Sequence, residues 1–140
     1  MRALVAIDFS ESARLACRWV LDRWVALGVT ELVFVHVLEQ DGEPLGDLER
    51  SVARVRQLVV EEAGERSLDG LALRYSVAHG DPAKAILETA RTANTDTVVM
   101  GTNGRRGLDR FLLGSVAEAV VRLSPCTVLV VKPGPEARSA

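Results

Sequence analysis

Three glycines and a serine in the stretch 100–115, MGTNGRRGLDRFLLGS, are spaced as in a backbone that grips phosphate groups. Gly101 and Gly104 are separated by two residues, Gly104 and Gly114 by nine, and Ser115 follows at once. A short apolar run precedes this stretch and a segment of helical spacing follows it. The order strand, glycine loop, helix places free backbone N–H groups at a helix N-terminus. An anion is stabilised there, because the unpaired donors and the positive end of the helix dipole both face it.

Several polar side chains near this loop each have two possible roles. Asp8, at the end of the first apolar run, is either a helix-start residue beside Ser10 or a ligand contact. Arg105 and Arg106 form a local basic excess; such loop charges are usually solvated, although one of them can reach a phosphate. Ser115 either caps the last helix or binds a phosphate, and the two roles occupy nearly the same place.

The remaining candidates for chemistry have structural explanations. His36 lies inside an apolar strand and His79 at the end of the next one, so both are expected to be satisfied buried or edge histidines. Asp81 is expected to cap a helix. Cys17 and Cys126 have mostly apolar neighbours and are expected to be buried, inert thiols. We find no nucleophile–base pair and no cluster of metal-ligating side chains, so the sequence predicts neither catalytic residues nor a metal site.

Composition limits the class of protein. The 140 residues fit one domain, and 48% hydrophobic content with 4% aromatic content predicts a core of Val, Leu, Ala and Ile. A net charge of −2 argues against a nucleic-acid or membrane-surface binder. The apolar runs are too short for a membrane span or a signal peptide, so a cytoplasmic location is expected.

Five strand-like runs alternate with four helical patterns. The strands are predicted at 3–7, 32–38, 71–77, 97–100 and 127–131, and the helices at 11–27, 48–63, 82–90 and 116–123, with a polar loop over 39–47. Gly28 is expected to end the first helix, and Asp81-Pro82 to begin the third. Polar residues in the third strand suggest a place near the sheet edge.

This alternation predicts an α/β fold: a doubly wound five-stranded parallel sheet of order 3-2-1-4-5 with helices on both faces. The strand order reverses between the first and fourth strands, whose carboxyl ends carry Asp8 and Gly101. The topology therefore predicts that the carboxylate and the glycine loop share one crevice, which favours ligand contact for Asp8. The predicted domain covers 1–133, with a disordered tail at 134–140.

The glycine spacing resembles that of the universal stress protein family, whose nucleotide-binding members carry G-x2-G-x9-G-[ST]. Here the pattern is formed by Gly101, Gly104, Gly114 and Ser115. Further segments resemble the family in the same order: VAIDFSESA (5–13), VHV (35–37), GDPAKAILETA (80–90) and LLGSVAEAVVRLSPCTVLVVKP (112–133). The resemblance covers nearly the whole chain.

The resemblance implies that the chain binds ATP. Mg²⁺ would be held through the phosphates, and Asp8 would either hydrogen-bond a sugar hydroxyl or contact the ion through water. The resemblance also implies a nucleotide site in which the phosphates and ribose contact Gly101, Asn103, Gly104, Gly114, Ser115 and Val116. Ala6, Ile7 and Asp8 would line the nucleoside end, and the backbone of Val37 would contact adenine. Met100, Arg105 and Ala117 complete the predicted site. Two residues depart from the family pattern: Ala117 replaces a hydroxyl residue, and Asn103 replaces a bulkier basic one; neither change removes a backbone donor.

The function expected from this resemblance is an ATP-binding regulatory or stress-response module. The alternatives are a slow ATPase or adenylyl-transferring enzyme on the same fold, or an interaction module that keeps the glycine loop only for folding. The run Thr127–Val131 would be an exposed sheet edge, so a homodimer paired through this strand is expected, as the resemblance also implies. The protein partners that such a module serves are not evident from the sequence.

Overall fold

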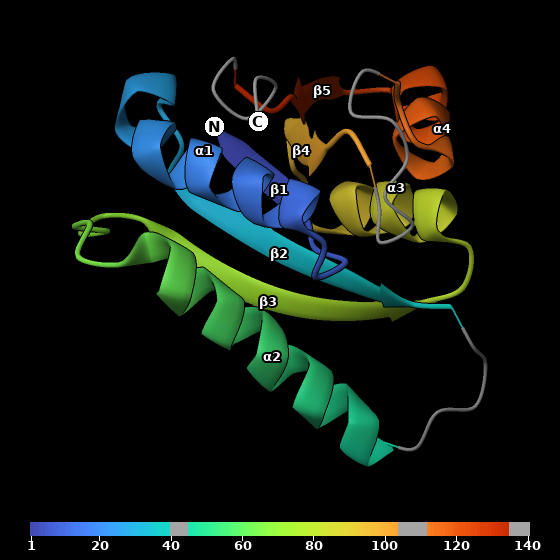
Figure 1. The fold of residues 1–140 in the computed structure, drawn as a ribbon, viewed down its shortest axis with the longest axis horizontal. Helices are drawn as coiled ribbons and strands as arrows, with labels where there is room; N and C mark the ends of the chain where they lie inside the picture. The colour runs from blue at the N-terminus through green and yellow to red at the C-terminus, as the bar shows by residue number, and fades with distance from the viewer. Residues whose placement is uncertain (40–44, 104–111, 135–140) are drawn as a thin grey trace.

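Strands and helices alternate along the chain (Figure 1). The computed structural model describes residues 1–39, 45–103 and 112–134. Its strands are β1 (Arg2–Ala6), β2 (Glu31–Leu38), β3 (Ala72–His79), β4 (Thr97–Gly101) and β5 (Thr127–Val131). Its helices are α1 (Glu11–Leu27), α2 (Leu45–Ala63), α3 (Pro82–Thr92) and α4 (Ser115–Leu123). Among the described residues, no helix is both long and apolar enough to span a bilayer.

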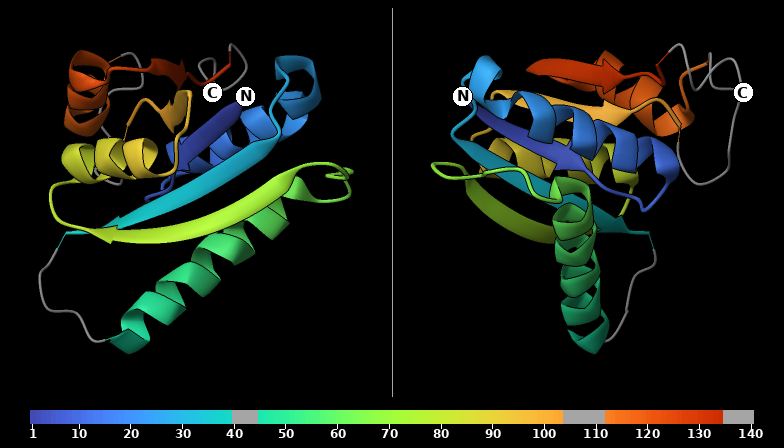
Figure 2. Two further views of the ribbon diagram at one scale, coloured as in Figure 1. Left: turned by 180° about the vertical axis from the view of Figure 1, so that it is seen from behind. Right: turned by 60° about the vertical axis from the view of Figure 1, so that its left-hand side comes forward.

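The five strands form one parallel sheet of order β3-β2-β1-β4-β5, which confirms the predicted fold class and strand order. Helices α1 and α2 cover one face and α3 and α4 the other (Figure 2). The edge strands are β3 and β5, so the predicted place of the third strand is also confirmed. The sheet reverses its order between β1 and β4, whose carboxyl ends therefore lie side by side.

Capping residues explain where three helix ends lie. Ser10 accepts a hydrogen bond from the backbone N–H of Ala13 at the start of α1, and Gly28 ends that helix with a φ of 72°. Asp81 accepts from the N–H of Lys84, with Pro82 as the first residue of α3. The expected cap at Asp81 and helix end at Gly28 are therefore confirmed.

Several element ends differ from the sequence prediction by one to three residues, among them the start of α2, both ends of β1 and the end of β3. Helix α2 begins at Leu45, inside the predicted loop 39–47, and Asp47 lies in its first turn, where the helix dipole favours a carboxylate. Strand β1 covers Arg2–Ala6 instead of 3–7, and Arg2 pairs in register with Glu31 of β2. Strand β3 runs on to His79, because it stays paired with β2 as far as Leu38. His79 is exposed at this sheet edge, as expected.

The core has two apolar layers, one on each face of the sheet. Alternate residues of β2 serve the two layers: Leu32 and Phe34 pack toward α1 and α2, whereas Val33 and Val35 pack toward α3 and α4. This division explains why β2 reads as an almost unbroken apolar run. His36, which is 6% exposed, is the polar exception in that run.

Cys17 lies in the first layer, at 0% exposure. Burial, followed by the nearby Glu62 carboxylate, raises the pKa of the Cys17 thiol from 9.0 to about 12. Glu62 itself accepts hydrogen bonds from Arg14 and Arg18, at 3.2 and 2.8 Å, and so links α2 to α1. The expectation of a buried, inert thiol is confirmed for Cys17, whereas Cys126 is only half-buried.

We expect Cys17 to resist a thiol reagent at pH 8 in the native protein and to react once urea unfolds the chain. Above pH 9 the unfolded chain loses the thiol proton while the folded chain keeps it, so stability falls as the pH rises toward 12. Urea midpoints measured from pH 8 to 11 should therefore fall less steeply for Cys17→Ala than for the wild type. Equal slopes for the two proteins would contradict this assignment.

Candidate functional site

A cavity of about 1080 Å³ opens at the carboxyl edge of the sheet, where β1 and β4 end side by side. It is lined by all the described residues of the predicted site: Ala6, Ile7, Asp8, Val37, Met100, Gly101, Asn103, Gly114, Ser115, Val116 and Ala117. The predicted site residues Gly104 and Arg105, together with Arg106, lie outside the described residues. The predicted shared crevice of Asp8 and Gly101 is therefore present, and its nucleotide contacts stay a prediction.

Asp8 stands at the start of α1 as well as in the cavity wall. Its Oδ1 accepts hydrogen bonds from the backbone N–H of Ser10 at 3.0 Å and from the Ser10 hydroxyl at 2.5 Å. The Ser10 hydroxyl in turn accepts from the N–H of Ala13 and so caps α1. The helix-start role of Asp8 and a place in the ligand cavity are thus compatible, since one carboxylate occupies both positions.

Gly101 allows α1 to approach β4 more closely than any other residue would. A Cβ at this position would lie 2.5 Å from the carbonyl oxygen of Ser12 and 2.7 Å from its carbonyl carbon. The Ser12 hydroxyl also accepts a hydrogen bond of 3.2 Å from the backbone N–H of Asn103. Sequence reasoning assigned Gly101 only to phosphate contact and missed this packing role, because no local pattern marks a contact between residues so far apart.

The first turn of α4 faces the cavity with its amides open. The N-cap is Gly114, which has no side chain to cap the helix, and Ser115 is the first helical residue, so the suggested cap by Ser115 is wrong. The Gly114 N–H donates to the carbonyl of Thr102 at 2.6 Å, and the first helical bond runs from the Glu118 N–H to the Gly114 carbonyl. Among the described residues, nothing accepts a hydrogen bond from the N–H groups of residues 115–117.

A buried polar atom lies beside this helix start. Thr102 is 2% exposed and lines the cavity, and its Oγ1 has no hydrogen-bond partner within the described part of the chain. A buried hydroxyl without a partner costs free energy unless a ligand or a water molecule satisfies it. The wall at α4 therefore combines three open amides, a helix dipole and an unsatisfied hydroxyl, a set that suits an anion carrying several oxygens.

The opposite wall comes from the ends of β2 and α2. The ring nitrogen Nδ1 of His36 lies 2.7 Å from the carbonyl oxygen of Ile7, so the expectation that His36 is a satisfied buried histidine is confirmed. Arg50 and Arg54 of α2 also line the cavity, together with Asp47. Sequence reasoning missed this contribution of α2, because its charged residues look like an ordinary solvated helix face.

Apolar side chains form the floor between these walls. Val35, Val37, Ala83, Ile86 and Met100 line the cavity and belong to the apolar layer under α3 and α4. Such a floor suits a flat heterocycle, while the open amides suit phosphates and Asp8 suits sugar hydroxyls. In the described part of the chain, no group of three or more His, Cys, Asp or Glu side chains is arranged to hold a metal ion.

Comparisons with known proteins agree with this fold. A family model described as "Universal stress protein family" matches residues 1–132. The chain is 33% identical over 138 residues to a universal stress protein of Thermus aquaticus, covering 92% of this chain and 96% of that one. A match to a universal stress protein of Methanocaldococcus jannaschii has 48% identity over 63 residues but spans only 37% of that relative and 45% of this chain.

Two solved structures extend the comparison. Another M. jannaschii protein superposes with a TM-score of 0.78 at 27% identity, covering 95% of this chain and 96% of that one. A universal stress protein of Archaeoglobus fulgidus, solved in complex with dAMP, superposes with a TM-score of 0.66. It is 21% identical and covers 94% of this chain and 98% of that one, so this likeness is one of fold.

The close packing at Gly101 predicts that one added methyl group lowers the stability of the protein. We expect Gly101→Ala to destabilise the protein by about 1–3 kcal/mol, because the new Cβ meets the backbone of Ser12 and not a flexible side chain. Gly134→Ala is the matched control, since a Cβ there has no atom within 4 Å. Urea unfolding measures both, and a Gly101→Ala midpoint equal to that of the control would rule out the close contact.

Proposed function

The chain belongs to the universal stress protein family, and from that premise we propose that it binds ATP in the cavity at the carboxyl edge of the sheet. The observation that carries this proposal is the first turn of α4, where the amides of Ser115, Val116 and Ala117 stand open beside the buried Thr102 hydroxyl. A phosphate chain is the anion that best satisfies several backbone donors at a helix N-terminus.

The rest of the cavity supports a nucleoside attached to those phosphates. In our proposal the ribose hydroxyls donate to Asp8, and the base lies near the backbone of Val37 over the apolar floor. Asp8 keeps its own place through the two hydrogen bonds from Ser10, so it requires little rearrangement to accept a further donor. The dAMP complex of the A. fulgidus relative supports an adenine nucleotide as the ligand class.

Magnesium would accompany the triphosphate. Mg²⁺ prefers oxygen ligands, keeps several waters and is commonly held by one or two carboxylates together with substrate phosphates. Asp8 is the carboxylate of the predicted site that lines the cavity, so we propose that it contacts the ion through a water molecule. The bound ion would neutralise phosphate charge beside Asp8 and so reduce the repulsion between the two.

We propose a regulatory role, in which nucleotide occupancy alters how the protein meets its partners. Phosphoryl transfer needs a group that orients the attacking nucleophile, in addition to phosphate binding. The described cavity wall explains binding through backbone amides and a carboxylate, and assigns no residue to that orienting role. Slow ATP hydrolysis or adenylyl transfer is the alternative, and a measurement of ATP turnover separates the two.

We expect calorimetric titration to give micromolar affinity for ATP with Mg²⁺. Gly114→Val should weaken this binding at least about tenfold, because its side chain crowds the phosphates at the start of α4. The φ of Gly114 is −67°, a conformation that valine also adopts, so the variant should still fold. Gly134→Ala, remote from the cavity lining, is the control and should bind as the wild type does.

Three outcomes of these measurements would contradict parts of the proposal. Wild-type affinity in Gly114→Val would overturn the phosphate assignment at α4. The absence of both a calorimetric signal and a thermal shift with ATP and Mg²⁺ would favour the interaction module without a nucleotide. Turnover of ATP well above background, lost in Asp8→Ala, would favour the enzymatic alternative.

We also propose that the protein forms a homodimer through β5. This strand is an edge of the sheet, and an unpaired edge invites a further strand. On the adjoining helix α4, Val121 and Leu123 are 46% and 54% exposed, so apolar surface continues from the edge. A two-fold partner that pairs the same strand covers both features at once.

Light scattering after gel filtration tests the dimer. At tens of micromolar we expect a mass of twice 15.1 kDa, and a shift toward the monomer in Val121→Glu, which places a charge in the apolar surface. Val60→Glu, on α2 and 58% exposed, is the control and should leave the mass unchanged. A wild-type protein that runs as a monomer at this concentration would refute the proposal.

A further inference from the structure

Phe9 has an unusual backbone conformation directly beside Asp8. Its φ is +64°, in the left-handed region that glycine and asparagine tolerate and that a bulky side chain disfavours. Within the described part of the chain, the other non-glycine residue with positive φ is Asn94, whose residue type commonly adopts it. A conformation of this cost persists when surrounding contacts hold it in place.

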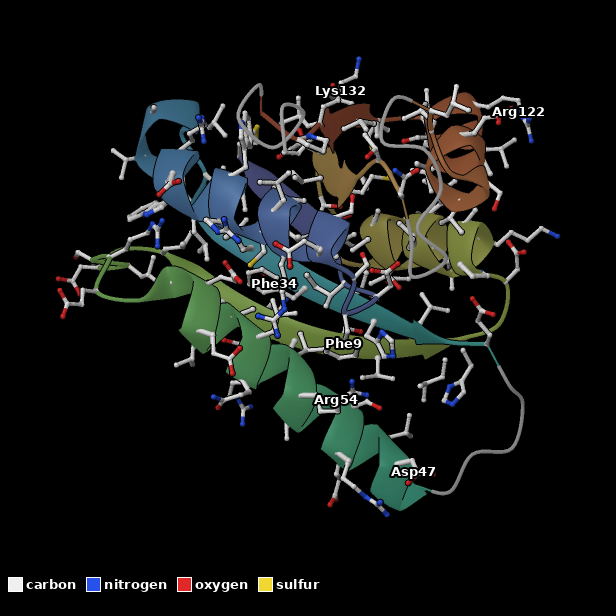
Figure 3. All side chains as sticks on the ribbon, viewed as in Figure 1. Phe9, Phe34, Asp47, Arg54, Arg122 and Lys132 are labelled. Atoms are coloured by element: carbon white, nitrogen blue, oxygen red, sulfur yellow. The ribbon has the colours of Figure 1, made fainter. Side chains whose placement is uncertain are left out.

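Two side chains from other elements hold the Phe9 ring. The guanidinium carbon of Arg54, on α2, lies 4.0 Å from the ring centroid, within the range of a cation–π contact. The ring of His36, on β2, lies 4.6 Å away centroid to centroid, tilted by 55°. Figure 3 shows Arg54 reaching from α2 to Phe9. The Phe9 ring is therefore held by contacts with two side chains, Arg54 and His36.

The backbone on both sides of Phe9 is tied to the cavity. On one side, the Ile7 carbonyl oxygen lies 2.7 Å from His36 Nδ1. On the other, the Ser10 N–H donates to Asp8 Oδ1, a bond that spans Phe9. Rotation of Phe9 to an ordinary negative φ would turn the Ser10 N–H away from that carboxylate. The contacts of the Phe9 ring with Arg54 and His36 therefore help to set where the Asp8 carboxylate lies.

We propose that Phe9 is a positioning residue for Asp8, and that Arg54 couples helix α2 to the nucleotide cavity through it. The ligand half of this proposal rests on the proposed function, whereas the placement of Asp8 does not.

A pair of variants that differ by one methyl group tests the backbone role. Phe9→Ala and Phe9→Gly both remove the half-buried ring and its contacts, but a positive φ costs glycine nothing, whereas it strains alanine. We expect Phe9→Ala to bind ATP about fivefold more weakly than Phe9→Gly, because only glycine keeps the positive φ without strain. Equal affinities for the two variants would overturn the proposal.

A second pair tests the coupling to α2. Arg54→Ala removes the contact with Phe9, and Arg50→Ala removes the same charge from the cavity wall one turn away, where Arg50 pairs with Asp47 at 3.2 Å. A general loss of positive charge would weaken ATP binding equally in both. We expect Arg54→Ala to be about fivefold weaker than Arg50→Ala, because it alone releases Phe9. Equal affinities of Arg54→Ala and Arg50→Ala for ATP would show that Arg54 does not act through Phe9.

Hydrogen exchange of the Ser10 amide separates this proposal from the proposed function, because it needs no nucleotide. We expect exchange at Ser10 to be about tenfold faster in Phe9→Ala and Arg54→Ala than in Phe9→Gly and Arg50→Ala, with the core amide of Val99 unchanged as the reference for folding. If the wild type binds no ATP but the four variants show this exchange pattern, the proposed function is wrong and the positioning role stands. Uniform exchange at Ser10 would sink the positioning role, whatever the nucleotide result.

Discussion

The close approach of α1 to the end of β4 is the contact on which the geometry of the cavity depends. Position 101 has room for a hydrogen atom only, because the backbone of Ser12 lies where a Cβ would be. That approach lets the Ser12 hydroxyl accept from the Asn103 N–H, so the helix start and the segment after β4 are joined directly. After the neighbouring strand β1, Asp8 and Ser10 make a second connection to the same helix turn. These contacts therefore fix the carboxyl ends of β1 and β4 relative to each other.

Between these two strand ends, the donors assigned to the phosphates are mostly backbone amides and not reactive side chains. The open amides of α4 come from a helix whose N-cap, Gly114, offers no side chain to occupy them. Helix α1, by contrast, has the Ala13 amide of its first turn bonded to the Ser10 hydroxyl. Of the helix starts beside the cavity, those of α1 and α3 carry a side-chain cap, from Ser10 and Asp81, whereas that of α4 carries none, and this difference is why the phosphates are assigned to α4.

Local patterns predicted the fold well because each element has a marked beginning or end. Gly28 and Asp81-Pro82 identified helix boundaries, and the alternation of strands and helices implied the sheet order with Asp8 and Gly101 in one crevice. The start of α2 was missed, since the residues before Asp47 look like a loop and become helical in context. Of the cavity, the contributions of Ser12 and Arg54 could not be predicted, because they depend on contacts between distant segments that leave no periodic signal. Gly104 and Arg105 lie outside the described residues, and their role stays a prediction.

The bond between the Gly114 N–H and the Thr102 carbonyl has a consequence for how such a protein can evolve. The bond ties together the two ends of the chain segment 103–113, so it sets where α4 begins relative to the sheet. The bond joins two backbone groups, so it can form whatever side chains stand at either end, and the placement of α4 can be inherited while the neighbouring side chains vary.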